Sequence, residues 1–251
     1  MQRRYALKTA GLTKRFGDFT AVDKVDFEIG EHEAVGIIGP NGAGKTTFLN
    51  LLTGRYLADE GSVWYKDRDI TRLRPEKRVH LGILRTFQLV HVFDNLNVYD
   101  NVALSLFRKI ENKPFPLKIF ISRLQRKDLA QPVQEILEEF YLSSQKHELV
   151  GNLSLGNKKK LELAMVYTAD PDVLLLDEPF AGLGDKEIDE VLVVLRKSVH
   201  KKTVIIIEHK ISKLTTVVDK LAVMHEGRII ASGPCEETLN HPEVRKSYWR
   251  M

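Results

Sequence analysis

One stretch of the sequence, AVGIIGPNGAGKTT at residues 34–47, decides the fold. Its first five residues are apolar and predict a buried strand, and an apolar helical run follows from Phe48. The residues between them match the pattern G-x-x-x-x-G-K-[ST], whose backbone N–H groups surround phosphate oxygens at the positive end of a helix. The predicted phosphate-binding residues are Gly39, Pro40, Asn41, Gly42, Ala43, Gly44, Lys45, Thr46 and Thr47.

Two residues at the end of this loop have individual roles. Lys45 is expected to place its charge on the β- and γ-phosphates, and the Thr46 hydroxyl is suited to bind Mg²⁺. The alternative is a chance match on an ordinary turn, and the flanking strand and helix argue against it. We therefore predict a nucleoside triphosphate site.

Two further apolar runs, 173–176 and 204–207, also end in polar residues. Asp177 and Glu178 follow the first run, and His209 follows the second after one residue. An α/β sheet binds its ligand at the carboxyl ends of its strands. Asp177 is thus a candidate for the magnesium site, and Glu178 is a candidate general base for an attacking water. The alternative is a solvated acidic strand end.

The roles of two other polar residues are less determined. His209 is either a hydrogen-bonded structural residue or a donor to the γ-phosphate. Gln88, after the short run 82–85, is either a surface glutamine or a neutral amide at another strand end.

The apolar strands alternate with helical patterns, which favours a parallel sheet covered by helices. The alternating texture of residues 1–32 and 62–66 suggests a small antiparallel sheet beside it. We predict one α/β domain, 1–251, with a nucleotide-binding core at 1–88 and 161–251. The inserted stretch 89–160 is predicted to be a helical subdomain, with helical segments at 101–107, 117–130 and 132–141.

Composition excludes several classes of protein. Hydrophobic residues make up 43% and charged residues 29%, which is a globular balance. The net charge of +4 comes from dispersed basic residues, so we expect no nucleic-acid partner. Cys235 is the single cysteine, so no intrachain disulfide forms. No stretch looks like a signal peptide or a membrane-spanning helix, and we expect a protein that reaches a membrane only through a partner.

Taken in order along the chain, these motifs resemble the ATP-binding subunit of an ABC transporter. The resemblance implies the RecA-like P-loop NTPase fold, ATP and Mg²⁺ as cofactors, and a head-to-tail dimer of ATPase subunits. It implies that Phe16 stacks on the adenine and that Gln88 contacts Mg²⁺ and links the site to a permease. It also identifies LSLGN, residues 153–157, as the signature motif that completes the partner's ATP site.

The signature departs from the family's usual Leu-Ser-Gly-Gly-Gln. Leu155 replaces the first glycine and Asn157 replaces the glutamine, while Ser154 and Gly156 are retained as expected γ-phosphate donors. Ser154 also reads as an ordinary helix N-cap, so we expect it to serve both purposes. A second departure is Gly184, where this family usually carries aspartate.

Local sequences such as RTFQ at 85–88 and IEHK at 207–210 resemble the ATPases of branched-chain amino acid importers. The resemblance implies integral membrane permease subunits, a second ATPase that is the same or a different chain, and indirectly an external substrate-binding protein. It places the chain at the cytoplasmic face of the cell membrane. Relatives that import urea or amides, or that export lipopolysaccharide, remain alternatives.

Two alternatives belong to other classes of protein. A soluble ABC ATPase that acts on ribosomes or DNA would usually carry two cassettes or a long coiled-coil insertion, and the insertion here lacks sustained heptads. A small-molecule kinase shares the phosphate loop but leaves the signature and His209 unexplained.

Overall fold

The computed structural model describes residues 5–86, 92–110, 127–199 and 201–248. The chain forms two compact units. We call residues 1–85, 172–179 and 195–251 the sheet unit, and residues 86–171 and 180–194 the helical unit. The predicted insertion 89–160 lies inside the helical unit, and the predicted subdomain boundaries stay a prediction.

A six-stranded sheet forms the centre of the sheet unit, with the order β10-β9-β3-β8-β7-β6. All neighbouring strands run parallel except β9 and β10, which are antiparallel. The predicted strands at 34–38, 173–176 and 204–207 are confirmed as β3, β7 and β8, which are buried at every position because helices cover such sheets. The bounds are β3 (Ala34–Ile38), β6 (Ile83–Arg85), β7 (Val173–Asp177), β8 (Thr203–Ile207), β9 (Lys220–His225) and β10 (Arg228–Pro234).

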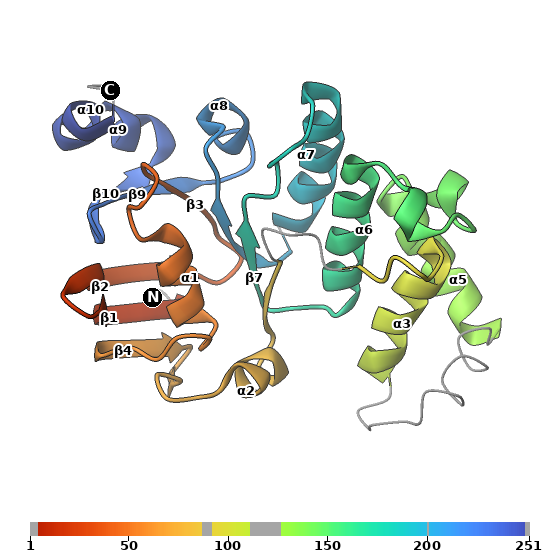
Figure 1. Cartoon of the computed structure of the whole chain (residues 1–251), viewed down its shortest axis with the longest axis horizontal. Helices are drawn as coiled ribbons and strands as arrows, with labels where there is room; N and C mark the ends of the chain where they lie inside the picture. The colour runs from red at the N-terminus through yellow and green to blue at the C-terminus, as the bar shows by residue number, and fades with distance from the viewer. Residues whose placement is uncertain (1–4, 87–91, 111–126, 200, 249–251) are drawn as a thin grey trace. The chain divides into compact units, whose positions relative to one another are not determined.

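The predicted antiparallel sheet is also confirmed. It has four strands in the order β2-β1-β4-β5, and its long hairpin turns at Gly17 and Asp18 (Figure 1). Its apolar residues join those of the parallel sheet and of α1 in one hydrophobic core. The strands are β1 (Tyr5–Phe16), β2 (Phe19–Gly30), β4 (Glu60–Tyr65) and β5 (Arg68–Asp69).

Helix α1 (Lys45–Leu52) follows the phosphate loop, and α2 (Pro75–His80) supplies the cap for its far end. Arg78 of α2 is 1% exposed, and its guanidinium donates to the carbonyls of Leu51 and Leu52 at 2.7 and 2.8 Å. The last carbonyls of a helix have no partner within it, so a cation there satisfies them and opposes the helix dipole. Burial lowers the pKa of Arg78 to about 10, so the side chain remains charged at neutral pH.

Short helices complete the sheet unit. Helices α9 and α10 pack beside β10, where Figure 1 shows them at the end of the chain. The bounds are α8 (Ile211–Leu214), α9 (Cys235–Asn240) and α10 (Pro242–Tyr248).

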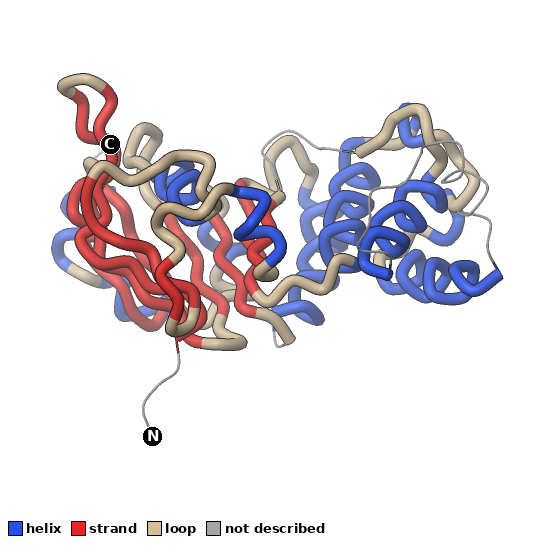
Figure 2. Tube along the Cα trace, turned by 90° about the horizontal axis from the view of Figure 1, so that it is seen from below, coloured by secondary structure: helices blue, strands red, loops and turns tan. Residues whose placement is uncertain are grey.

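The helical unit contains no named strand among its described residues, and Figure 2 shows it as blue helices joined by loops. Its helices α3, α5 and α6 contact one another, and α7 begins in this unit and ends in the sheet unit. The bounds are α3 (Val98–Ile110), α5 (Lys127–Glu139), α6 (Leu155–Thr168) and α7 (Asp185–Val199), with 3₁₀ turns at Ser143–Gln145 and Val150–Asn152.

One predicted helix boundary is wrong. The helical pattern at 101–107 is confirmed within α3, but the break expected between 130 and 132 is absent, because α5 runs through Pro132. Proline inside a helix removes one backbone hydrogen bond, and the packing of α5 on α3 and α6 opposes that loss. The first part of the predicted segment 117–130 lies outside the described residues. Within the described residues, no helix combines the length and apolarity needed to cross a bilayer.

Candidate active site

The phosphate loop depends on close backbone packing that only glycine permits. Gly44 has φ +97° and precedes α1, and a Cβ there would lie 2.2 Å from the carbonyl oxygen of Ala21. Gly39 is similar, since its Cβ would lie 2.2 Å from the Met224 carbonyl oxygen. The loop is thus held against β2 and β9, and the unpaired N–H groups of the first turn of α1 follow it directly.

Lys45 is placed to neutralise an anion in this loop. The side chain is 6% exposed, and Nζ donates to the carbonyls of Gly39 and Pro40 at 2.7 and 3.0 Å. Burial lowers the pKa of Lys45, and the carboxylates of Glu178 and Asp177 oppose that shift. Phosphate oxygens would form charge-assisted hydrogen bonds with this buried ammonium and compensate the cost of its burial. Thr46 and Asn41 are exposed, and Thr47 is partly buried.

Asp177 lies at the end of β7 and is held by a residue that the sequence interpretation gave no role. Its Oδ2 accepts from Nη2 of Arg85 at 2.5 Å, and the two side chains are 2% and 7% exposed. Nη1 of the same guanidinium donates to Oδ1 of Asn50 in α1 at 2.6 Å. Arg85 therefore ties the end of β7 to the helix that begins at the phosphate loop.

The other oxygen of Asp177 is available for a cation. Oδ1 is buried and has no hydrogen-bond partner within the described chain. A buried carboxylate oxygen in this state is costly unless a cation or a cation-bound water contacts it. Magnesium is bound in nucleotide sites by one or two protein groups together with phosphates and waters, so Asp177 Oδ1 and the Thr46 hydroxyl fit such an ion.

Glu178, the next residue, is in a strained backbone conformation. Its φ is +51°, unusual for a residue with a Cβ, and its N–H donates to the Ile207 carbonyl of β8 at 2.9 Å. Oε1 of Glu178 lies 3.2 Å from Nε2 of His209. Backbone strain of this kind persists where the surrounding structure requires it, often at functional sites. The structure thus brings together Glu178 and His209, which the sequence analysis had placed at the ends of different strands.

The remaining predicted residues of the sheet unit have separate outcomes. Phe16 ends β1 and is 45% exposed, so its ring is accessible. Gln88 lies outside the described residues, and its roles stay predictions. Tyr56, which the sequence interpretation did not single out, packs its ring edge on Phe16 with 5.4 Å between ring centroids. The sequence shows that Arg85 lies three residues before Gln88 and that Tyr56 is aromatic. It does not show that Arg85 contacts Asp177 or that Tyr56 contacts Phe16.

In the helical unit, Ser154 is the N-cap of α6, as one of the two predicted roles requires. Its Oγ accepts from the Asn157 N–H at 3.2 Å. Leu155 is 44% exposed, and a Cβ on Gly182 would lie 2.7 Å from Leu155 Cδ2. The unusual leucine of the signature therefore lies against the backbone of the loop that precedes α7, and Gly182, with φ +76°, leaves room for it.

Gly156 makes a second close contact with the same region of the helical unit. A Cβ on Gly156 would lie 2.3 Å from Oε1 of Glu187, a residue of α7. Oε2 of Glu187 accepts from the Gly184 N–H at 3.1 Å, so this carboxylate caps the start of α7. Gly184, which stands where aspartate is usual, thus contributes its backbone N–H to the cap of α7.

Comparison with known proteins places this geometry in a family. The ABC transporter family model matches residues 22–181. The high-affinity branched-chain amino acid transport ATP-binding protein LivG of Salmonella typhimurium is 34% identical over 247 residues, covering 96% of each chain. The sulfate/thiosulfate import ATP-binding protein CysA of Mycobacterium bovis is 35% identical, over 95% of this chain and 64% of its own length.

The solved structures agree. The crystal structure of the ADP conformation of an ATP-binding cassette of an ABC transporter superposes with a TM-score of 0.82 and 31% identity, over 98% of this chain and 99% of that one. The fold of the chain agrees with the family match. The chain belongs to the ABC transporter family, in which it is an ATP-hydrolysing subunit.

Proposed function

We propose that this subunit drives a permease that imports branched-chain or other amino acids. The observation that carries the proposal is the end-to-end match to LivG, which covers 96% of both chains. The match to CysA has a similar identity of 35% but spans only 64% of that protein, which is longer than this chain. Permease subunits and an external substrate-binding protein are then the partners, and the chain lies at the cytoplasmic face of the membrane.

In the proposed site, each residue contributes an interaction that its position allows. Lys45 moves its ammonium from the Gly39 and Pro40 carbonyls onto the β- and γ-phosphates. Glu178 accepts a proton from the attacking water, and His209, 3.2 Å from Glu178, contacts the γ-phosphate.

Three further residues complete the site in this proposal. Asp177 Oδ1 and the Thr46 hydroxyl would hold Mg²⁺, which would supply positive charge that neutralises the phosphates. Phe16 stacks on the adenine.

The second half of each site comes from another ATPase subunit, the same or a different chain. Ser154 and Gly156 contact the γ-phosphate bound to the partner, so ATP binding becomes dimerisation free energy. The packing of Leu155 against Gly182 supports this role, because a leucine side chain held within the helical unit does not occupy the space of the partner's nucleotide.

Uptake in the host cell tests the substrate. Deleting this chain should abolish high-affinity uptake of leucine, isoleucine and valine, and should leave sulfate and urea uptake intact. The wild-type chain should restore uptake, and Glu178→Gln should fail to do so although it is produced in equal amount. Intact amino acid uptake with lost sulfate or urea uptake would refute the amino acid proposal while leaving the ATPase assignment in place.

A further inference from the structure

Two neighbouring aromatic rings lie at the surface of the sheet unit, one at the end of β1 and one shortly after the end of α1. Phe16 is 45% exposed and Tyr56 is 36% exposed. Their ring centroids are 5.4 Å apart with an interplanar angle of 74°, an edge-to-face arrangement. Such pairs are favourable beyond their buried area, and they restrict how each ring rotates. One side of Phe16 is therefore braced by Tyr56.

Tyr56 is itself fixed to the phosphate-loop helix. Its N–H donates to the carbonyl of Asn50, a residue of α1, at 3.1 Å. The side chain of Asn50 accepts from Arg85, which also holds Asp177. The backbone of Tyr56 is thus attached to the last turn of the helix that begins at Lys45.

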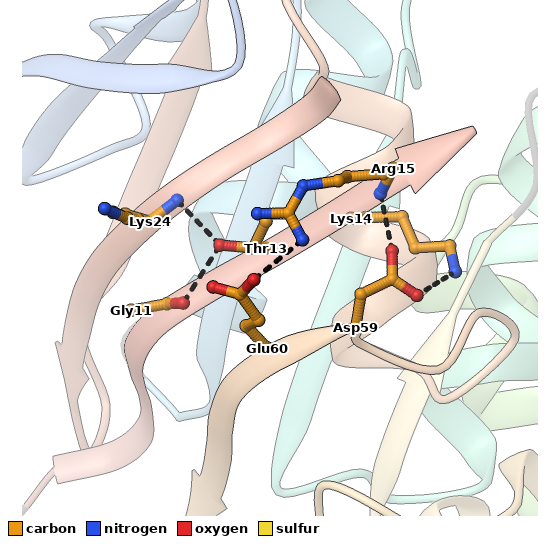
Figure 3. Close-up of polar contacts among 7 residues, drawn as sticks. All are labelled: Gly11, Thr13, Lys14, Arg15, Lys24, Asp59 and Glu60. Atoms are coloured by element: carbon orange, nitrogen blue, oxygen red, sulfur yellow. Dashed lines mark hydrogen bonds and ion pairs between the residues drawn. The ribbon is translucent and has the colours of Figure 1, made fainter. Parts of the chain in front are cut away.

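A polar network holds the end of β1, the strand that Phe16 ends, and Figure 3 shows Lys14 and Arg15 contacting Asp59 and Glu60. Asp59 accepts from Nζ of Lys14 at 3.0 Å and from the N–H of Arg15 at 2.6 Å. The N–H of Arg15 and the ammonium of Lys14 hold the pKa of Asp59 below its usual value. Arg15 is further paired with Glu60 at 2.7 Å. Both residues that precede Phe16 are therefore anchored to the segment 59–60.

Lys14 also contacts the ring directly. Its Nζ lies 5.5 Å from the centroid of Phe16, within the range of a cation–π contact. Because Asp59 fixes the same ammonium, it also limits how the Phe16 ring can move. Phe19 offers a contrast, since it pairs with Phe16 across the turn, is 63% exposed and makes no ring contact among the described residues.

We propose that Tyr56, Lys14 and Asp59 are positioning residues that hold Phe16 as a preorganised platform for the base of the nucleotide. The inference rests on the proposed adenine contact of Phe16. Stacking on a ring already held in place costs less ordering entropy than stacking on a ring that rotates freely. A platform of this kind favours purine over pyrimidine triphosphates, since a larger base covers more of the ring.

Binding of two probes separates base recognition from phosphate recognition. The first probe is a non-hydrolysable ATP analogue, and the second is inorganic tripolyphosphate, which has no base. Both are titrated calorimetrically with Mg²⁺ into the wild-type chain and into Phe16→Leu, Tyr56→Leu, Asp59→Asn and the matched control Phe19→Leu. Tyr56→Leu and Asp59→Asn should weaken the analogue about three- to tenfold. Tripolyphosphate should bind all variants with unchanged affinity, and Phe19→Leu should bind both probes like the wild type.

The other outcomes are distinguishable. If Phe16→Leu weakens the analogue but Tyr56→Leu and Asp59→Asn do not, the platform is refuted while the adenine contact stands. If Tyr56→Leu or Asp59→Asn weakens both probes equally, the residue acts on the phosphate loop and the positioning role is wrong. If Phe16→Leu has no effect on the analogue, the proposed adenine contact itself fails. A wild-type chain that binds neither probe would contradict the proposed function.

Discussion

Removing Arg85 should destabilise the sheet unit strongly, because it leaves a buried carboxylate without its partner. In Arg85→Met, Asp177 keeps a side chain that is 2% exposed and loses the 2.5 Å contact at Oδ2, while Oδ1 already has no partner within the described residues. Breaking a buried ion pair from one side costs about 3–5 kcal/mol. For a chain of this size that corresponds to a fall in melting temperature of about 10 °C.

The assay is thermal unfolding by calorimetry, with a matched exposed pair as control. Lys66 contacts Asp172 at 3.0 Å, but the two side chains are 46% and 51% exposed. Lys66→Met should therefore cost less than about 1 kcal/mol.

The double variant Arg85→Met/Asp177→Asn should be less destabilised than the sum of its parts, because neither charge is then left alone. A melting temperature of Arg85→Met equal to that of Lys66→Met, or a double variant whose destabilisation equals the sum of the single ones, would refute the role of Arg85.

Four other predictions follow from the described contacts. Glu178→Gln should retain ATP binding and lose turnover by about 10²-fold or more, measured by phosphate release beside nucleotide titration; wild-type turnover would exclude its role as base. Arg78→Met should cost about 1–3 kcal/mol in chemical unfolding, because it leaves the buried carbonyls at the end of α1 without their charged donor. Gly156→Ala should weaken ATP-dependent dimerisation measured by light scattering, and Glu187→Ala in the same chain should restore part of it by clearing the space. The contacts of Asp59 lower its pKa in the folded chain. Its contribution to stability is therefore complete above the pKa of the unfolded chain and is lost as the pH falls through the pKa of the folded chain. The melting temperatures of wild type and Asp59→Asn should converge at acid pH.

The signature region shows how the structure refined an expectation. The sequence predicted that Ser154 is both a cap and a ligand, and it did not decide where Leu155 points. The hydrogen bond from Asn157 confirms the cap, and Leu155 packs on Gly182. The contact with the partner's nucleotide stays a prediction, to be checked by the mass of Glu178→Gln in solution with and without ATP. A chain that binds ATP yet remains monomeric would point to a different ATPase as partner.

The sequence by itself determined the phosphate loop, the three central strands and the carboxylates at their ends. These features are local, because a glycine pattern, an apolar run and the polar residue after it are contiguous, and their conformations depend mainly on neighbours in the chain. The continuity of α5 through Pro132 was missed because a local pattern treats proline as a helix break and does not contain the packing of the folded chain.

Only the tertiary structure decided which groups meet. Arg85 reaches Asp177 because β6 lies beside β7, and Arg78 caps α1 from a helix that follows two intervening strands. Glu187 lies on Gly156, and Tyr56 braces Phe16, although neither pair is close in the sequence. Each contact depends on the order of the strands and the path of the loops between them. That order is set by burial of the whole core, a property of the folded chain that no short stretch of residues contains.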